Sequence, residues 1–512
     1  MTSQSAQPAQ PAQSAQPTKT AQPAQPTKSA LSRRDFLRKT ALAAVVAPWL
    51  VPAGVVRAQD GRPVPSNRTT FALIGCGNMG PAGLNAVLGY KDAQVIATCD
   101  VFRSRANNWR DRVDKHYKNK GATAYQDFRE LLARKDLDSV EIATGDYWHV
   151  PLALAAIRAG KDTYVEKPLG VSVRWAQVLR AEINKRKAIF QFGTWQRSRP
   201  HFRRAVEIVR SGLLGKISRV EAWAPSLQWM DNRSLGNIFD PKSRIRAQHL
   251  DKSAPPVPAD LNYDLWLGPA PQKPYNPIRV SPQGIYHSSD YALGFLAGWG
   301  IHPLDIALWG LDADLAAPVS YDAKGRLPDV PGLFDTIATW DVHARYPNGT
   351  ELHFMDTSVA LDVAGKSLGK GRVGGEGTTF FGEDGKWLHV NRGGARASHP
   401  EIGKYLRIAR NGGGWPPAGG KADEVKEPNW VTLQAAENGS HWHNFIARVR
   451  DRKPTLNPIE SAFTGDLICH IANAAIRVGR SVKWDTKNET IVGDAAANAI
   501  LDRPARDPWA VA

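Results

Sequence analysis

Cysteine is scarce in this chain, whose 512 residues include only Cys76, Cys99 and Cys469. None of them stands in the Cys-x-x-Cys spacing that is typical of a zinc site or a redox pair. The sequence therefore argues against a disulfide scaffold. At this length, a prior of one domain per about 150 residues suggests two or three domains.

Long apolar runs are missing beyond the N-terminal region, so we expect no membrane span there. The formal net charge is +17, but Lys and Arg are spread rather than collected in blocks, and no nucleic-acid-binding motif is present. We therefore expect no nucleic-acid partner. The excess of positive charge could instead favour an anionic cofactor or substrate.

The first 58 residues are predicted to contain a targeting signal rather than a folded domain. Residues 1–30 repeat Ala-Gln-Pro units and lack the apolar surface that would offset chain entropy, so we expect disorder. Residues 32–37, Ser-Arg-Arg-Asp-Phe-Leu, resemble a twin-arginine signal, and an apolar stretch follows. We expect residues 31–58 to be this signal peptide, with cleavage after Ala58.

Such a signal places the protein in the periplasm or another extracytoplasmic compartment and makes the twin-arginine translocation machinery a partner. If the signal were retained, it would tether the protein to the membrane. Against a true span, the apolar stretch is short of about 20 residues and is broken by two prolines.

A nucleotide-binding turn is predicted directly after the apolar strand 71–74. The sequence there is Gly75-Cys76-Gly77-Asn78-Met79-Gly80, and Pro81 opens a helical pattern. Glycines let the backbone approach a pyrophosphate, and a helix N-terminus offers unpaired N–H groups to its charge. We predict that the cofactor is bound here by Gly75, Gly77, Asn78, Met79 and Gly80.

The next predicted strand, 94–99, ends at Asp100, which lies 20 positions after Gly80. A carboxylate at this spacing accepts hydrogen bonds from the adenosine ribose and repels a 2′-phosphate, which favours NAD. Arg103 and Arg105 follow at once and could accommodate NADP instead, with Arg105 as a cofactor contact.

Further strands are expected at 139–144, 162–167 and 189–193, with helical patterns between them. This alternation predicts a parallel sheet in an α/β Rossmann domain over residues 69–195. A doubly wound domain that binds no nucleotide is the alternative.

Four motifs carry a family resemblance. They are Thr144-Gly145-Asp146-Tyr147-Trp148-His149, Tyr164-Val165-Glu166-Lys167-Pro168-Leu169, Phe192-Gly193-Thr194-Trp195-Gln196-Arg197 and Gly300-Ile301-His302-Pro303-Leu304-Asp305. Together they resemble the Gfo/Idh/MocA oxidoreductases, over about 69–484. The resemblance implies an α+β C-terminal domain with an open, mainly antiparallel sheet, a carbohydrate substrate and a homo-oligomer. It also implies cofactor contacts from Thr144, His149, Glu166, Lys167 and Trp195.

Lys167 is the first predicted catalytic residue. A proline restricts the residue before it to extended geometry, so the ammonium leaves a strand end in a fixed direction, at the sheet edge where α/β folds bind ligands. It can then donate to a substrate hydroxyl and to the ribose.

His302 and Asp305 are the other predicted catalytic residues. Three positions apart in a helical segment, they share a face, and the imidazole can take the hydroxyl proton as hydride leaves carbon. Asp305 would orient or hold the substrate. A purely structural pair is the alternative. Many relatives carry an acid four residues before this histidine, and Gly298 occupies that position here.

The second domain is predicted over 196–484, with a C-terminal tail at 485–512. We expect a helix at 201–213, a strand at 216–223 and hairpin turns at 347–349 and 383–385. Further helices are expected at 444–450 and 460–478.

The long stretch between Leu227 and Gly298, rich in Pro, Trp, Tyr and Asp, is predicted to be a pocket wall and lid. Arg197, Tyr286 and Trp299 are predicted substrate contacts, although each could equally be packing.

No metal site is predicted. His441-Trp442-His443 could place two imidazoles on one side of a strand, but the segment begins the helix at 444–450, where this spacing splays them apart.

Three functions remain open from the sequence. The first is an exported NAD(P)-dependent oxidoreductase for a sugar, polyol or glycoside. The second is an NAD-dependent glycoside hydrolase or lyase that works by transient oxidation and elimination with cofactor recycling. The third is a non-catalytic nucleotide or sugar binder, which Gly298 favours.

Overall fold

The computed structural model describes residues 67–228, 236–369, 373–406, 425 and 427–511. The expected disordered segment and export signal lie outside these residues. Within them, no helix combines the length and the apolar character that crossing a membrane requires.

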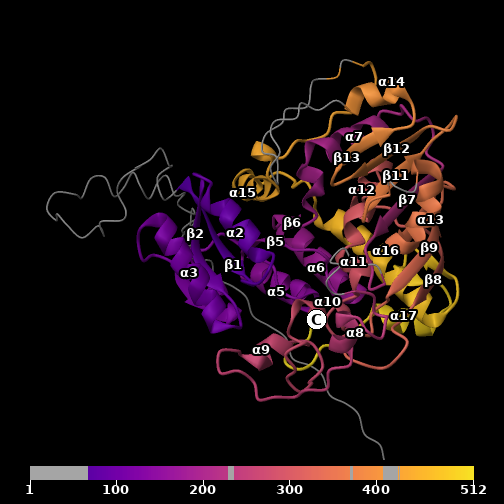
Figure 1. Ribbon diagram of the computed structural model, residues 1–512. Helices are drawn as coiled ribbons and strands as arrows, with labels where there is room; N and C mark the ends of the chain where they lie inside the picture. Colours follow the sequence, from indigo (N-terminus) through magenta and orange to yellow (C-terminus); the bar gives the residue numbers. More distant parts are fainter. Residues whose placement is uncertain (1–66, 229–235, 370–372, 407–424, 426, 512) are drawn as a thin grey trace, which may run out of the picture. The chain divides into compact units, whose positions relative to one another are not determined.

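The N-terminal domain is built on a six-stranded parallel sheet with the order β3-β2-β1-β4-β5-β6. Its elements, indigo to magenta in Figure 1, are β1 (Thr69–Ile74), α2 (Gly80–Leu88), β2 (Ala93–Cys99), α3 (Arg103–Tyr117), β3 (Thr123–Tyr125), α4 (Phe128–Leu132), β4 (Ser139–Ile142), α5 (Asp146–Arg158), β5 (Asp162–Val165), α6 (Val173–Arg186) and β6 (Phe190–Phe192). The predicted Rossmann sheet is thus confirmed. Ligands of such sheets bind where the strand order reverses, here between β1 and β4.

The second domain carries a nine-stranded sheet, β13-β12-β11-β7-β10-β9-β8-β14-β15, in which β7 and β10 are parallel and the other pairs antiparallel. Its strands are β7 (Arg219–Ala224), β8 (Ser320–Arg326), β9 (Thr339–Arg345), β10 (Glu351–Asp356), β11 (Gly377–Phe381), β12 (Trp387–Asn391), β13 (Gly394–Ala397), β14 (Val482–Asp485) and β15 (Thr490–Ile491). Its α-helices are α7 (Pro200–Arg210), α8 (Arg244–His249), α9 (Tyr263–Leu267), α10 (Pro282–His287), α11 (Phe295–Gly298), α12 (Ile301–Leu311), α13 (Thr357–Leu368), α14 (Pro400–Gly403), α15 (His441–Asp451), α16 (Ile459–Val478) and α17 (Ala495–Leu501). The mainly antiparallel sheet agrees with the expectation.

Both predicted hairpin turns are present. The turn at 347–349 joins the antiparallel pair β9 and β10, and the turn at 383–385 joins β11 and β12. In the second turn Asp384 and Gly385 have φ of 54° and 69°, the left-handed geometry that suits the twist of a tight hairpin.

Helices α7, α12 and α16 pack against this sheet, and α13 packs near β7, β9 and β10. Trp223 and Met355 are fully buried in one cluster with Ala360 and Ala364 of α13. Along β9, by contrast, buried and more exposed residues alternate. One face of β9 therefore points into the core, and the other is only partly covered.

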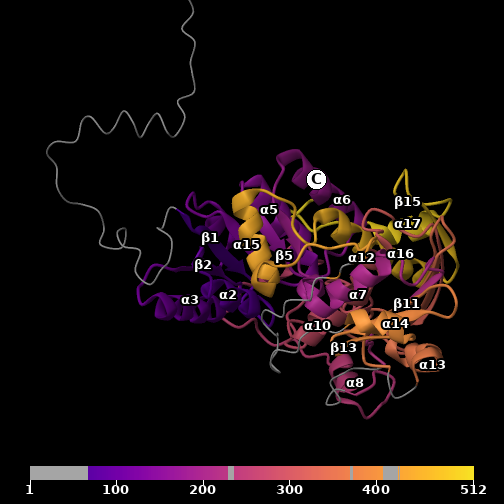
Figure 2. The same cartoon turned by 90° about the horizontal axis from the view of Figure 1, so that it is seen from above.

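The C-terminal part of the chain is more integrated than the sequence suggested. Helix α15, seen beside the N-terminal sheet in Figure 2, returns to the Rossmann domain, where Phe445 and Ile446 are fully buried. In the segment predicted as a tail, α17 packs on α16, and the Trp509 ring lies 5.0 Å from that of Trp148. Residues 485–511 thus pack on the fold, whereas the sequence predicted a tail. A short helix and a contact between two Trp residues far apart in the chain leave little signal in the sequence.

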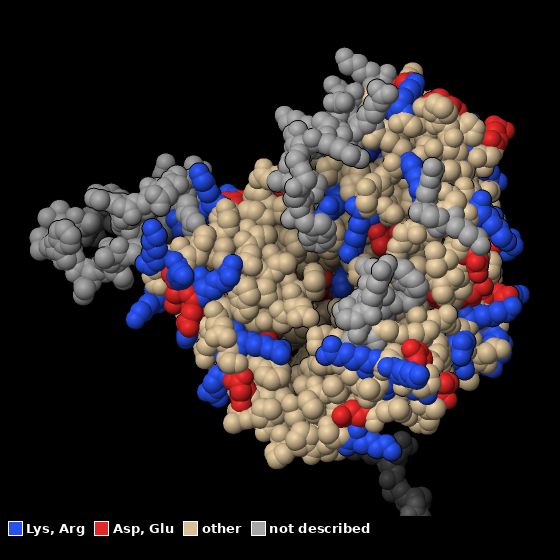
Figure 3. Space-filling model, viewed as in Figure 1, with Lys and Arg blue, Asp and Glu red and all other residues tan. Residues whose placement is uncertain are grey.

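On the face shown in Figure 3, Lys and Arg are interspersed with Asp and Glu, in keeping with their spread along the sequence.

Candidate active site

A cavity of about 390 Å³ lies at the carboxyl ends of β1, β2, β4 and β5. The predicted site residues that line it are Gly75, Gly77, Asn78, Met79, Asp100, Arg105, Thr144, Glu166, Lys167 and Tyr286. Leu265, Trp266 and Ile285 complete one side of it. The long stretch after Leu227 therefore supplies a pocket wall, as predicted.

The glycine turn fits the phosphates of a dinucleotide. Gly75 has φ of 99°, and a Cβ there would lie 2.4 Å from the Ala143 carbonyl oxygen. At Gly80 a Cβ would lie 2.2 Å from the Gly75 oxygen, whereas at Gly77 it would meet nothing within 4 Å. Two glycines thus allow the tight turn and the close helix, and the third leaves the backbone open to a ligand at the start of α2.

Asp100 is held in place by the backbone on both sides. Its Oδ2 accepts a hydrogen bond from the Cys76 N–H and its Oδ1 from the Phe102 N–H, each at 2.8 Å. Burial raises the pKa of this carboxyl, and the two N–H donors and Arg105 oppose the rise. The Arg105 guanidinium lies 4.0 Å above the Phe102 ring. The expected ribose acceptor and the expected phosphate contact therefore line the same end of the cavity.

Lys167 follows β5 in the loop that faces the second domain. Its Nζ donates to the Gly298 carbonyl oxygen at 3.3 Å and lies 5.7 Å from the Tyr286 ring centroid. Burial opposes the charge, but Tyr286, Glu166 and Asp146 outweigh it and raise the pKa of the ammonium. The Lys167–Pro168 peptide bond is cis. A cation is thus fixed where the cofactor cavity meets the second domain.

Gly298 occupies the position at which many relatives carry an acid, and the structure shows which side chain lies beside it. A Cβ at this position would lie 3.4 Å from two carbon atoms of the Tyr286 ring. The tyrosine packs over the glycine and lines the cavity, so a phenol stands beside Lys167 in this chain.

His302 is buried at the start of α12, outside the lining of the main cavity. Its ring meets Trp195 and Trp299 edge-on, and no described residue forms a hydrogen bond with its Nδ1. Burial, together with the charges of Arg392 and Lys167, lowers the pKa of this imidazole well below its usual range. His302 is therefore neutral at neutral pH and can accept a proton.

Trp195 and Trp299, expected to contact cofactor and substrate, both pack against one cation. The Arg392 guanidinium lies 4.8 Å from the Trp195 ring centroid and 4.5 Å from that of Trp299. The larger of the two charge effects on His302 comes from this arginine, which the sequence did not single out, and the smaller comes from Lys167.

Arg197 and Asp305 contact each other rather than open space. The guanidinium donates to both Asp305 carboxylate oxygens at 2.8–3.0 Å and to Asp314 at 2.7 and 2.9 Å. Asn457 donates to Asp305 as well. The structure thus places Arg197, predicted as a substrate contact, and Asp305, predicted to hold the substrate, in a buried ionic network in which their charges are paired.

His149 is likewise engaged with the backbone. Its Nδ1 donates to the Pro168 carbonyl at 2.6 Å, and its Nε2 lies 3.3 Å from the Thr144 carbonyl. Burial lowers the pKa of His149 to about 4. The ring ties the loop after β4 to the loop of Lys167 and shapes the pocket without lining it.

Asp146 is a candidate that the sequence analysis passed over. It lines the cavity and is 3% exposed, and its Oδ2 has no hydrogen-bond partner among the residues that the structure describes. Burial raises the pKa of this carboxyl to about 8, although Lys167 opposes the rise. Its position inside the recognised 144–149 loop was the signal that could have identified it.

Two family models match the chain. The model for the Gfo/Idh/MocA oxidoreductase family, NAD-binding Rossmann fold, matches residues 69–194, and the model for the family's C-terminal α/β domain matches residues 238–367 and 427–511. Together they account for well over half of the sequence.

Curated relatives match over shorter stretches. A glycosyl hydrolase family 109 protein of Shewanella amazonensis is 29% identical over 222 residues, which is 39% of this chain and 48% of the relative. An inositol 2-dehydrogenase of Salmonella paratyphi B is 30% identical over 149 residues, 28% of this chain and 42% of the relative. The match thus spans about half the length of these relatives or less.

Solved structures show the same fold over most of the chain. GenD2 from gentamicin A biosynthesis, in complex with NAD, has a TM-score of 0.52 at 18% identity and covers 82% of this chain and 97% of its own. Myo-inositol 2-dehydrogenase from Lactobacillus plantarum has a TM-score of 0.51 at 15% identity, covering 81% and 99%. The chain therefore belongs to the Gfo/Idh/MocA oxidoreductase family, with its NAD-binding Rossmann domain and its C-terminal α/β domain.

Proposed function

We propose that this protein is an NAD-dependent oxidoreductase that acts on a sugar, polyol or glycoside. The observation that carries the proposal is Lys167, a buried cation that lines the dinucleotide cavity and touches Gly298 of the second domain. NAD held by the glycine turn and Asp100 would supply the acceptor for a hydride from the substrate carbon. What remains for the protein is to orient the substrate hydroxyl and to take its proton.

Two side chains are proposed for these tasks, one to orient the hydroxyl and one to accept its proton. Lys167 donates a hydrogen bond to the hydroxyl oxygen and stabilises negative charge that develops there. His302, next to the cavity at the start of α12, is the proposed proton acceptor, because its lowered pKa keeps the imidazole neutral. Tyr286, beside Lys167, contributes a contact to the sugar.

The test is hydride transfer from substrate to protein-bound NAD. A panel of sugars, polyols and glycosides labelled with deuterium on the ring carbons is incubated with the protein, and the nucleotide is analysed by mass spectrometry. Deuterated NADH from at least one compound is the expected result. If no compound transfers deuterium, the non-catalytic binder becomes the better description.

A second candidate function is redox-neutral cleavage of a glycoside, favoured by the glycosyl hydrolase family 109 relatives. Oxidation of one hydroxyl to a carbonyl acidifies the neighbouring C–H, a base takes that proton, and the glycosidic group leaves and is protonated to an alcohol. Water then adds to the resulting double bond in a hydrolase but not in a lyase, and the hydride returns to the carbonyl carbon. Many turnovers of a glycoside per bound NAD, without accumulation of NADH, would identify this function. Stoichiometric NADH formation would identify net oxidation.

Export is also part of the proposal and rests on residues 31–58. Because the twin-arginine route carries folded proteins, NAD would be bound before translocation. Replacing Arg33 and Arg34 by Lys should retain the protein in the cytoplasm, as measured by cell fractionation. By its family resemblance the protein is also proposed to form a homo-oligomer, which light scattering of the purified protein would measure.

A further inference from the structure

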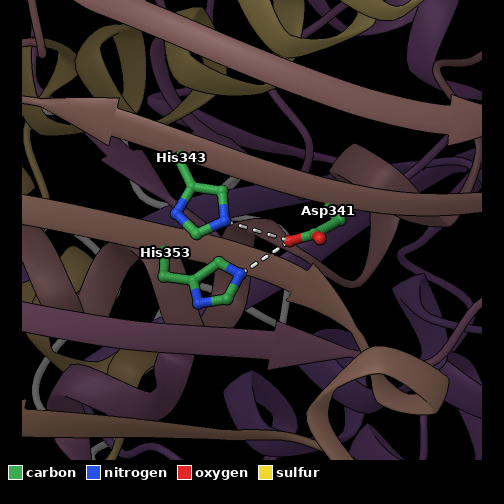
Figure 4. A group of neighbouring side chains, drawn as sticks. All are labelled: Asp341, His343 and His353. Atoms are coloured by element: carbon green, nitrogen blue, oxygen red, sulfur yellow. Dashed lines mark hydrogen bonds and ion pairs between the residues drawn. The ribbon is translucent and has the colours of Figure 1, made fainter. Parts of the chain in front are cut away.

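Two histidines and one aspartate gather on strands β9 and β10, and none of them lines the cofactor cavity. Asp341 and His343 are two positions apart on β9 and therefore share a face of the sheet. His353 of β10 is the register partner of His343. Figure 4 shows both rings directed at the Asp341 carboxylate.

The distances suit a shared ion. His353 Nε2 lies 2.6 Å from Asp341 Oδ1, and His343 Nε2 lies 3.7 Å from the same oxygen. One ligand atom from each of the three residues falls within 4.8 Å of the others. Around a tetrahedral zinc ion with bonds of about 2.0–2.1 Å, ligand atoms are about 3.4 Å apart. Small side-chain rotations therefore reach that geometry.

A hydrogen bond to a neighbouring carboxylate fixes the orientation of His343. Its Nδ1 donates to Glu351 Oε1 at 2.9 Å, which leaves Nε2 directed at Asp341. Metal-bound histidines typically donate their other ring N–H to a carboxylate in this way. The two imidazoles also stack with centroids 4.0 Å apart and planes at 22°, so the second ring is held in line with the first.

A buried acid adds negative charge behind this cluster. Glu221 of β7 is the register partner of His353 on its other side and is 1% exposed. Within the described part of the chain, its Oε2 has no hydrogen-bond partner. Its other oxygen pairs with Arg219 at 3.2 Å. A buried carboxylate oxygen that lacks a donor is costly unless a cation lies nearby.

We propose that Asp341, His343 and His353 bind a divalent transition-metal ion of the zinc type. Two imidazoles and one carboxylate form a ligand set that suits zinc and excludes magnesium and calcium, which prefer oxygen donors. In the metal-free form a hydrogen bond joins His353 Nε2 and Asp341 Oδ1, and the ion would take its place. Three protein ligands leave one tetrahedral position for water. The ion would link β9 to β10 and stabilise the sheet without taking part in the NAD chemistry.

The test uses tag-free full-length protein treated with chelator and titrated with Co²⁺, whose absorption spectrum reports its coordination. We expect one Co²⁺ per chain with a tetrahedral nitrogen and oxygen spectrum, displacement by Zn²⁺, and a higher thermal midpoint with either ion. His343→Ala and His353→Ala should each weaken binding by about 100-fold, and Glu351→Gln by about 10-fold.

His443→Ala is the matched control, because His443 lies 3.3 Å from Asp92 and, among the described residues, no second histidine pairs with that carboxylate. This variant should bind Co²⁺ like the parent protein. If the parent protein binds no ion, or if binding survives both His343→Ala and His353→Ala, the three residues are only a hydrogen-bonded cross-strand group and the proposal is overturned.

Discussion

Lys167 donates from Nζ to the backbone carbonyl of Gly298, so the loop after β5 is joined to the second domain at the rim of the cofactor cavity. A side-chain carboxylate at this position would compete for the ammonium, whereas a carbonyl takes only one of its three donors. The remaining donors are available for a substrate hydroxyl.

Replacing Lys167 by Met should lower kcat by about 10²- to 10⁴-fold, because the methionine keeps the length of the chain but removes the donor. NAD affinity should change far less, since the glycine turn and Asp100 are untouched. Steady-state kinetics and calorimetric titration with NAD separate the two effects. Lys115→Met on the exposed side of α3 is the control, and an equal loss of kcat there would refute the assignment.

His302→Asn should also lower kcat by about 10²-fold or more. The pH profile is the more informative measurement. Because burial and the neighbouring cations keep His302 neutral, the native enzyme should show no loss of activity as pH falls through 6.5, the usual pKa of histidine. An acidic limb at 6.5 that disappears in His302→Asn would contradict this environment. His116→Asn on α3 is the control.

Asp305→Asn should affect stability rather than substrate affinity. Removing one partner of a buried ion pair costs about 3–5 kcal/mol when the other charge is left unpaired, and this is an upper limit here because Arg197 keeps its pair with Asp314. Arg197 and Asp305 are each 2% exposed in their side chains. We expect a clearly lower thermal midpoint, with an unchanged KM for the sugar at a temperature where the variant is folded.

Asp312→Asn is the matched control for this experiment. Asp312 pairs with Arg210 at 2.8 Å, but its side chain is 70% exposed, so the pair contributes about 0–1 kcal/mol. A raised KM in Asp305→Asn, with normal stability, would support the predicted role of Asp305 in holding substrate.

The sequence predicted features that depend on neighbouring residues along the chain. The glycine turn, the strand that ends at Asp100 and the hairpin at 383–385 are all encoded within about ten residues. These features require particular backbone angles, such as the positive φ at Gly75, and such angles restrict which residue type can occupy the position. These predictions agree with the structure.

Features that depend on distant contacts were not predictable in the same way. Arg197 and Asp305 both occupy motif positions. Only the fold shows that their charges pair, because the two residues are 108 positions apart in the sequence. Asp341, His343 and His353 become neighbours only when β9 and β10 pair in register. The short edge strand β3 lacked a buried apolar run, since its residues are exposed or half-buried.

Asp100→Ser should weaken NAD binding by about 10- to 100-fold, because a hydrogen bond to a charged group contributes about 1.5–3 kcal/mol. The same change removes the repulsion of a 2′-phosphate, and Arg105 lines the same cavity, so affinity for NADP should rise. Titration of nucleotide-free protein with both cofactors measures the ratio. Asp111→Ser, on the exposed part of α3, should leave it unchanged. An unaltered ratio in Asp100→Ser would mean that Asp100 does not contact the ribose.

Asp146 should make stability depend on pH in a direction opposite to that of an ordinary carboxyl. Its folded-state pKa, about 8, lies above the usual 3.8, so the folded protein holds a proton that the unfolded chain releases. The stabilisation is complete below about pH 4 and is lost as pH rises through 8, with a limiting slope of about 1.4 kcal/mol per pH unit.

Thermal midpoints of native protein and Asp146→Asn, measured without NAD from pH 5 to about 9, provide the test. The native midpoint should fall relative to that of the variant as pH rises, because the asparagine cannot ionise. Other buried acids, such as Glu141 and Glu166, are present in both proteins and cancel in the difference. Parallel curves would show that Asp146 is already ionised at neutral pH, as an ion pair with Lys167 would require. The cavity would then offer the substrate a neutral pair of side chains instead of a net positive charge.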